Sequence, residues 1–181
     1  QSSDKEDELL GDIETPLAVG NFNNSPLGHW VVDSWLASVP KADFAICNSG
    51  AFRQPLPSGS ILYKDILSVM PFENNLFIVT LTGEHLISEL SKDEPVVGGL
   101  KYTYKLDETG KRQIVQVFDN YGTEIDKTKK YSVIVNDFMY SGGDGYLFYQ
   151  HDPSPVDTGL SWRDPVIKAL KQLSNEGQKV S

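Results

Sequence analysis

The chain has 181 residues, with 16 Lys and Arg against 25 Asp and Glu, so its formal net charge is −9 at neutral pH. Hydrophobic residues make up 39% and charged residues 23%, which is typical of a folded globular protein and not of a disordered one. The single cysteine excludes an intrachain disulfide and a multi-cysteine zinc site, and the acidic balance argues against a general nucleic-acid binder.

Both ends of the chain are polar, and the sequence between them alternates helical and strand patterns on short connections. We expect residues 1–8 and 176–181 to be polar tails and residues 9–175 to form one compact domain. No apolar stretch reaches the ~18 residues that a membrane helix needs, so the sequence predicts no membrane span.

The first clear element is a helix over residues 25–39. Ser25 is a favourable N-cap, and Pro26 stands at the first helical position, where a missing N–H has no consequence. Apolar residues then repeat every four positions and form one stripe, which consists of Leu27, Val31, Trp35 and Val39. Pro40 ends the pattern.

The remaining patterns predict an α+β fold. We expect strands at 43–47, 75–81, 98–105, 113–118 and 131–136. We expect helices at 62–69, beginning from Gly59 and Ser60, at 83–91 after Thr82, and at 164–173 with Pro165 in the first turn. Of the three histidines, His29 and His85 fall on expected helices, where a structural or exposed role is the simpler interpretation.

The first segment whose residues could bind a ligand follows a short apolar strand and reads Asn48-Ser49-Gly50-Ala51-Phe52-Arg53. Asn48 offers a donor and an acceptor, Gly50 allows a left-handed backbone, and Arg53 is a permanent cation suited to phosphate or carboxylate. The alternative is a surface turn whose arginine forms an ordinary salt bridge.

Two further segments place aromatic and acidic residues in loops. Phe72, in Pro71-Phe72-Glu73-Asn74, is either a core aromatic or, if it lies in a cleft, a stacking surface for a planar ligand. Asp144 stands among three glycines in the segment 136–146 after a strand. Its carboxylate either accepts hydrogen bonds from a diol such as a ribose, or caps its own turn.

Taken in order, these segments and several others resemble one family. The blocks are Asn-Ser-Gly-x-x-Arg (48–53), Gly-x-Ile-x-x-x-Asp-Ile (59–66), Pro-Phe-x-Asn (71–74) with a β run and Leu-Thr-Gly (81–83), Gly-Leu-x-Tyr-x-Tyr (99–104) and Asn-Asp-Phe-x-x-x-Gly-Gly-Asp-Gly-Tyr (136–146). The sequence resembles the C-terminal domain of the 5′-nucleotidase / UDP-sugar hydrolase family from about Leu10 to Leu173. The resemblance implies mixed sheets flanked by helices, in a layered α/β/β/α sandwich.

The resemblance also implies roles for six residues. Phe72 and Phe138 would clamp the two faces of a nucleobase, and Asp144 would bind the ribose hydroxyls. Asn48, Gly50 and Arg53 would lie at the ribose or phosphate end.

The sequence departs from the family at two places. Asn23 stands where the family usually has an arginine, which removes one phosphate-binding cation. Ala51 and Phe52 replace a frequent Gly and Ile, and Ala51 matters only if the backbone there needs a positive φ.

In the family, hydrolysis is carried out by an N-terminal metallophosphatase domain with two metal ions, and no such ligand segments occur in these 181 residues. We therefore expect no catalytic residue, no metal site and no cofactor in this chain, and no hydrolase activity without a metallophosphatase partner in cis or trans. We expect a nucleotide or nucleoside as the ligand and, by resemblance only, an extracytoplasmic location. The alternatives are a non-catalytic nucleotide-binding module, or the specificity domain of a hydrolase acting on UDP-sugars or cyclic nucleotides.

Overall fold

A computed structural model describes residues 5–176 of the chain. Its centre is a five-stranded sheet with the order β5-β2-β8-β4-β9. These strands are β2 (Phe44–Cys47), β4 (Asn75–Thr82), β5 (Val96–Gly98), β8 (Lys130–Asn136) and β9 (Val156–Ser161). Strands β2 and β8 run parallel, and the other neighbours are antiparallel.

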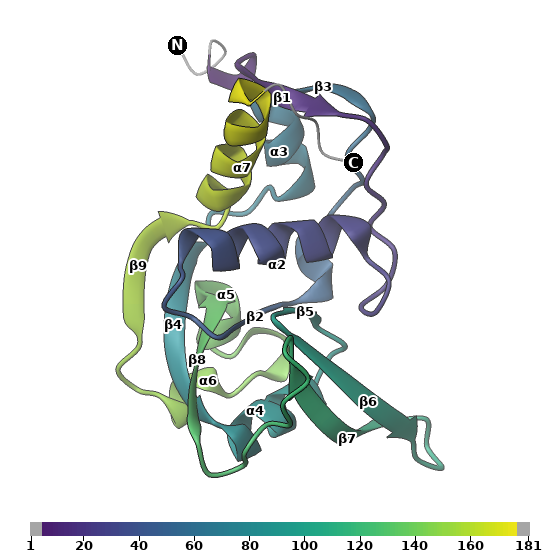
Figure 1. The fold of residues 1–181 in the computed structure, drawn as a ribbon, viewed down its shortest axis with the longest axis vertical. Helices are drawn as coiled ribbons and strands as arrows, with labels where there is room; N and C mark the ends of the chain where they lie inside the picture. The colour runs from purple at the N-terminus through teal and green to yellow at the C-terminus, as the bar shows by residue number, and fades with distance from the viewer. Residues whose placement is uncertain (1–4, 177–181) are drawn as a thin grey trace.

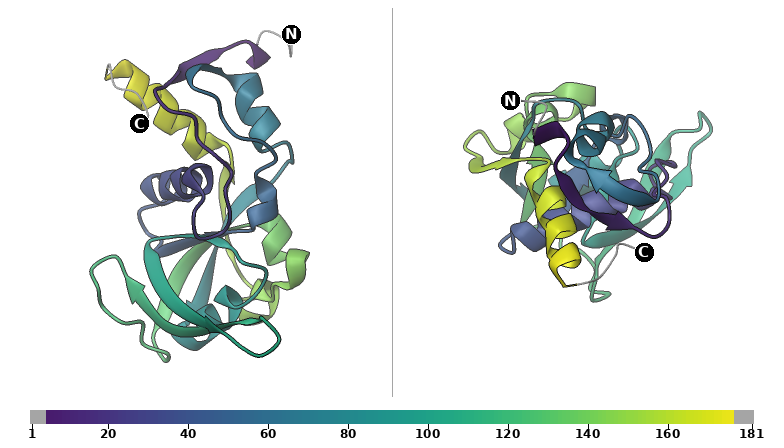
Figure 2. Two further views of the ribbon diagram at one scale, coloured as in Figure 1. Left: turned by 90° about the vertical axis from the view of Figure 1, so that its right-hand side faces the viewer. Right: turned by 90° about the horizontal axis from the view of Figure 1, so that it is seen from above.

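Two small sheets complete the fold, and helices lie on both sides of the central sheet (Figure 1). One pairs β1 (Leu9–Ile13) with β3 (Gly59–Leu62), and the other pairs β6 (Leu100–Leu106) with β7 (Arg112–Asp119), which extends as a long hairpin (Figure 2). The longer helices are α2 (Pro26–Ser38), α3 (Tyr63–Val69), α4 (Gly83–Leu90) and α7 (Asp164–Asn175). Short helical segments are η1 (Ser49–Ala51), α5 (Asp137–Tyr140), η2 (Gly143–Gly145) and α6 (Phe148–His151). The predicted α+β class with several sheets flanked by helices is confirmed.

The two faces of the central sheet pack against separate cores. Along β2, Ala45 and Cys47 belong to one apolar cluster, and Phe44 and Ile46 belong to the other. This alternation follows from the two-residue period of a strand. The first core is shared with α2, α3, α7 and the β1–β3 sheet, and the second with α4, α6 and the β6–β7 hairpin.

Local signals in the sequence correctly placed several elements. The Ser25 hydroxyl accepts a hydrogen bond from the Gly28 N–H at 3.0 Å, which is the predicted cap of α2. The Thr82 hydroxyl caps α4 in the same way, by accepting from the His85 N–H at 3.2 Å. The predicted strands at 43–47, 75–81, 113–118 and 131–136 correspond to β2, β4, β7 and β8.

Two expectations about the elements were wrong, and one strand was missed. Gly59 and Ser60 do not begin a helix but form β3, because residues 9–13 supply a partner strand that was not predicted. The expected strand 98–105 is divided at Gly99, whose φ of +81° turns the chain from β5 into a different sheet. The edge strand β9 was also missed, although it hydrogen-bonds to β4.

Of the expected polar tails, residues 1–4 and 177–181 lie outside the described part of the chain. Residues 7 and 8 form ion pairs, between Asp7 and Lys64 at 3.2 Å and between Glu8 and Lys171 at 2.8 Å. The chosen boundaries of the domain stay a prediction. In residues 5–176, every helix is too short or too polar to cross a bilayer.

Candidate functional site

A cavity of about 470 Å³ opens at one edge of the central sheet. The six residues singled out in the sequence all line it, namely Asn48, Gly50, Arg53, Phe72, Phe138 and Asp144. Four others complete the lining, namely Ala51, Glu73, Asn74 and Trp162. The cavity thus brings together three sequence-predicted segments that lie far apart along the chain.

The parallel pairing of β2 and β8 explains this convergence. Because the two strands run in the same direction, both carboxyl ends lie at the same edge of the sheet. Strand β2 ends at Cys47 and leads directly into segment 48–53, and β8 ends at Asn136 and leads into segment 137–146. The third segment, 70–74, enters from α3 and continues into β4, which pairs with β8.

Asn48 is buried and joins the two strand ends. Its side-chain carbonyl accepts a hydrogen bond from the Asn136 amide at 2.9 Å, and the Asn136 carbonyl accepts from the Met139 N–H at 2.9 Å. Since an unpaired buried amide is costly, this bond fixes the Asn48 side chain beside the cavity. Burial also raises the pKa of the neighbouring Cys47 thiol, which keeps it protonated.

Arg53 lines the cavity and is exposed. Its guanidinium donates to the Gly50 carbonyl at 3.2 Å and lies 5.5 Å from the centre of the Phe72 ring, a cation–π distance. Within residues 5–176 it forms no salt bridge with a carboxylate, so the ordinary salt bridge expected in the alternative interpretation is not found.

Neither Gly50 nor Ala51 has a positive φ. The backbone at Gly50 is therefore not in the left-handed region that glycine would allow. For the same reason the alanine at position 51 brings no backbone strain, and this departure from the family pattern has no conformational cost.

Phe72 and Phe138 are half-exposed at the cavity, with 47% and 45% of their surface accessible. These values rule out the alternative that Phe72 is a core aromatic. The Phe138 ring is backed by Gly143, where an added Cβ would come within 2.6 Å of three ring carbons. Each aromatic ring therefore keeps free surface that a planar ligand could cover.

Asp144 has a left-handed backbone, with φ of +58°, between Gly142 at +107° and Gly145 at +83°. The glycines let the loop reverse sharply and bring the carboxylate to the cavity. Its neighbour Asp93 also has a positive φ, of +36°. Partial burial first, and the nearby Asp144 carboxylate second, raise the pKa of Asp93.

Four lining residues were missed in the sequence. Asn74 belongs to the Pro-Phe-x-Asn block and could have been proposed from it; with its amide nitrogen facing Asp137, it donates to that carboxylate at 2.7 Å. Trp162 belongs to no motif recognised in the sequence, and it lies in the connection between β9 and α7. Asn23, where an arginine was expected, is not among the lining residues.

The histidines lie apart from this cavity. His29 Nδ1 is 2.8 Å from the Ser25 carbonyl on α2, and the rings of His85 and His151 stack with centres 4.0 Å apart. His151 Nε2 lies 2.9 Å from the buried Glu89 carboxylate. In residues 5–176, His, Cys, Asp and Glu form no group of three arranged to hold a metal ion.

A family model described as the 5′-nucleotidase C-terminal domain matches residues 7–151. The chain belongs to this family. Two relatives are 31% identical: the trifunctional nucleotide phosphoesterase protein YfkN of Bacillus subtilis (strain 168), over 169 residues, and the cell wall protein Lmo0130 of Listeria monocytogenes serovar 1/2a (strain ATCC BAA-679 / EGD-e), over 147 residues. The matches cover 83% and 70% of this chain, but 11% and 18% of those proteins.

Solved structures share the fold of this 5′-nucleotidase C-terminal domain. The 5′-nucleotidase precursor from Thermus thermophilus superposes with a TM-score of 0.85 and 24% sequence identity. The superposition covers 95% of this chain and 38% of the Thermus chain. The domain therefore corresponds to one part of considerably longer relatives.

Proposed function

We propose that this domain binds a nucleoside or nucleotide and selects the substrate of a 5′-nucleotidase-type phosphohydrolase. The observation that carries the proposal is the cavity in which two half-exposed phenylalanines, Phe72 and Phe138, meet the carboxylate of Asp144 and the guanidinium of Arg53. Aromatic faces, a carboxylate and a planar cation match, in turn, the base, the diol and the phosphate of a nucleotide.

The two phenylalanines would hold the base between them. Every nucleobase has a π-face, so stacking binds purines and pyrimidines alike and gives broad base tolerance. The 470 Å³ of the cavity is within the usual range for small-ligand sites. Because the rings come from the separate segments 70–74 and 137–146, their spacing is set by the sheet and not by a single flexible loop.

The ribose and phosphate would lie toward Asp144 and toward Asn48, Gly50 and Arg53, respectively. Among the described lining residues Arg53 is the single cation, while Glu73 and Asp144 are both acidic. One cation can pair with one phosphate but is outnumbered by carboxylates. We therefore expect the isolated domain to bind nucleosides and monophosphates, with little gain from additional phosphates.

The expected affinity is modest. Two stacking faces contribute about 2–6 kcal/mol and a charged hydrogen bond about 1.5–3 kcal/mol, against an association cost of several kcal/mol. An NMR titration with adenosine should therefore give a Kd between millimolar and high-micromolar.

Substitution of the two rings tests the base clamp. Phe72→Ala and Phe138→Ala should each weaken adenosine binding by at least about fivefold, since each removes one stacking face. Tyr121→Ala, which removes an aromatic ring that is 95% exposed and outside the cavity, is the matched control. Unchanged binding in both phenylalanine variants would refute the base clamp.

We propose that hydrolysis takes place on a metallophosphatase domain, in cis or trans, and that its divalent metal ions are not held by this chain. The chain covers only a small part of its longer relatives, and this supports a separate domain for hydrolysis. A phosphatase assay of the isolated chain with AMP and Mn²⁺ should show no turnover, and robust turnover would refute the division. The name of the Listeria cell wall relative supports an extracytoplasmic location.

A further inference from the structure

The connection between β9 and α7 lies against the loop that carries Phe72. Trp162 and Arg163 belong to this connection, beyond the part of the chain that the family model matches, and both are almost completely buried. Trp162 lines the cavity, whereas Arg163 lies behind the Phe72 loop. Nothing in the motifs of the sequence points to either residue.

Arg163 holds the Phe72 loop by three groups of its guanidinium. Nε donates to the Met70 carbonyl at 2.7 Å, one terminal nitrogen donates to the Phe72 carbonyl at 2.8 Å, and the other donates to the Glu73 carboxylate at 3.4 Å. The Glu73 carboxylate is largely exposed, so the buried guanidinium of Arg163 is stabilised mainly by its hydrogen bonds to the two carbonyls. Such a planar fork fixes two acceptors at once in a way that lysine cannot reproduce.

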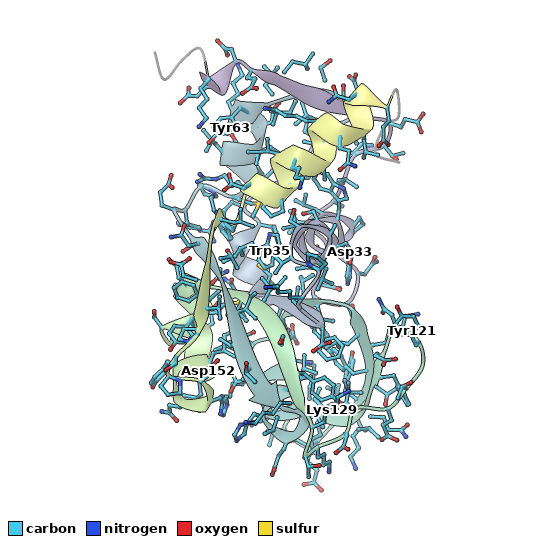
Figure 3. The ribbon with its side chains drawn as sticks, turned by 60° about the vertical axis from the view of Figure 1, so that its left-hand side comes forward. Asp33, Trp35, Tyr63, Tyr121, Lys129 and Asp152 are labelled. Atoms are coloured by element: carbon cyan, nitrogen blue, oxygen red, sulfur yellow. The ribbon has the colours of Figure 1, made fainter. Side chains whose placement is uncertain are left out.

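Trp162 supports the same loop from the adjacent position. Its indole N–H donates to the Phe72 carbonyl at 2.9 Å, so this carbonyl accepts two bonds. Its backbone N–H donates to the Asn74 carbonyl at 3.0 Å, and its own carbonyl accepts from the Trp35 indole at 2.9 Å. Trp35 belongs to α2, and Figure 3 shows it in the interior of the molecule. The loop is thereby connected to a helix of the first core.

The Phe72 loop is not part of a helix or strand, so its backbone lacks the regular hydrogen bonds of such an element. Residues 71–74 lie between the end of α3 and the start of β4, outside any regular element. The carbonyls just past a helix end have no partner within the helix, and a cation there also interacts favourably with the helix dipole. Trp162 and Arg163 thus supply, to the Met70 and Phe72 carbonyls, hydrogen bonds that a regular element does not provide here.

We propose that Arg163, assisted by Trp162, is a positioning residue that sets the place of the Phe72 ring for base stacking. This inference rests on the proposed nucleoside site and extends it to the segment beyond residue 151. Arg163 does not itself line the cavity, so its effect on a ligand must pass through the Phe72 loop.

The test compares Arg163→Gln, Arg163→Lys and Trp162→Phe with wild type in adenosine titrations by NMR. Stacking on one face is worth about 1–3 kcal/mol, so losing it weakens binding by about 5- to 150-fold. Arg163→Gln should weaken adenosine binding by about as much as Phe72→Ala, and Arg163→Lys should not restore it. In a Phe72→Ala background, Arg163→Gln should cause no further loss. Additive effects of the two substitutions would overturn the inference.

Val31→Ala is the control for general destabilisation, because Val31 is completely buried in the same core and does not line the cavity. It should lower the melting temperature and leave the adenosine Kd unchanged. If Arg163→Gln does not fold, Arg163→Lys keeps the test decisive, since it retains the positive charge but cannot hold the Met70 and Phe72 carbonyls at once. Unchanged binding and unchanged Phe72 resonances in Arg163→Lys would then overturn the inference.

A second measurement separates this inference from the proposed function. The ring resonances of Phe72 in the ligand-free domain should shift and broaden in Arg163→Gln, whereas those of Phe138 should not. If Phe72→Ala leaves adenosine binding unchanged, the base clamp fails whatever Arg163 does. If Phe72→Ala weakens binding but Arg163→Gln changes neither the Kd nor the Phe72 resonances, only the positioning role is refuted.

Discussion

Gly143 lies directly behind the ring of Phe138. An added Cβ at position 143 would come within 2.5–2.6 Å of three carbons of that ring, closer than real Cβ contacts allow. Gly143 has no positive φ, so the backbone itself would accept alanine. The glycine is therefore needed for the space that the aromatic ring occupies and not for the turn.

The first prediction follows from that contact. Gly143→Ala should displace the Phe138 ring and weaken adenosine binding by several-fold, while the melting temperature changes little because the ring is half-exposed and can move. A double-mutant cycle by NMR titration checks the mechanism. In a Phe138→Ala background, Gly143→Ala should have no further effect, and an equal loss in both backgrounds would show that another contact is responsible.

The second prediction concerns Asp144 and the ribose. Asp144→Asn keeps a side chain that tolerates the left-handed φ of +58° but replaces a charged acceptor by a neutral one. Since hydrogen bonds to charged groups exceed neutral ones by about 1 kcal/mol, adenosine should bind about five- to tenfold more weakly. Binding of 2′,3′-dideoxyadenosine, which lacks the diol, should be unchanged. Equal losses for both ligands, measured by titration, would contradict diol recognition by Asp144.

The third prediction contrasts two carboxyl groups with opposite pKa shifts. The pKa of Asp93 is raised by partial burial and by Asp144, so the native state binds a proton more tightly than the unfolded chain. Stability from Asp93 is therefore present at acidic pH and is lost as the pH rises above the ordinary carboxyl value of about 4. Asp93→Asn should make the protein slightly more stable than wild type at neutral pH, and the difference should vanish in acid, below that value.

Asp107 provides the comparison with the opposite sign. Hydrogen bonds from the Thr109 hydroxyl and the Lys111 N–H lower its pKa, so its contribution is present at neutral pH and is lost as the pH falls through that lowered value. Asp107→Asn should slightly destabilise the protein at neutral pH. Thermal denaturation from acidic to neutral pH measures both variants, and two differences of the same sign at neutral pH would be inconsistent with the assigned causes.

The fourth prediction concerns Glu89, a completely buried carboxylate on α4. It accepts from Lys92 Nζ at 2.8 Å and from the Leu147 N–H at 3.1 Å, just after the loop that carries Asp144. Glu89→Ala removes the carboxylate from Lys92, from the Leu147 N–H and from the neighbouring His151, and should lower the free energy of unfolding by about 1–3 kcal/mol. Ser88→Ala, a more accessible position on the same helix, should change it by less than about 0.5 kcal/mol in the same urea titration. Similar losses in the two variants would mean that burial of Glu89 is not what matters.

Caps and short sequence motifs were enough to place many of the elements and to name candidate ligand-binding residues. Ser25 caps α2 through the Gly28 N–H only three residues away, so this cap was predicted from the sequence, and the helix after Thr82 was placed correctly as well. The ordered motifs indicated the family and named six residues that all line one cavity, because each motif combines an element end with an unusual polar or aromatic residue.

The meeting of distant segments could be seen only in the folded chain. Gly59 and Ser60 form a strand because Leu9–Ile13 lies beside them, and no local pattern contains that pairing. The parallel alignment of β2 and β8 brings Asn48 and Asp144 to one cavity, and Arg163 contacts the Phe72 carbonyl across 91 residues of sequence. Local propensity acts over a few residues, whereas a site assembled from strand ends depends on packing between segments far apart in the chain. For this reason the sequence indicated most of the polar and aromatic residues that face the cavity but missed Trp162 and Arg163, which hold the Phe72 loop.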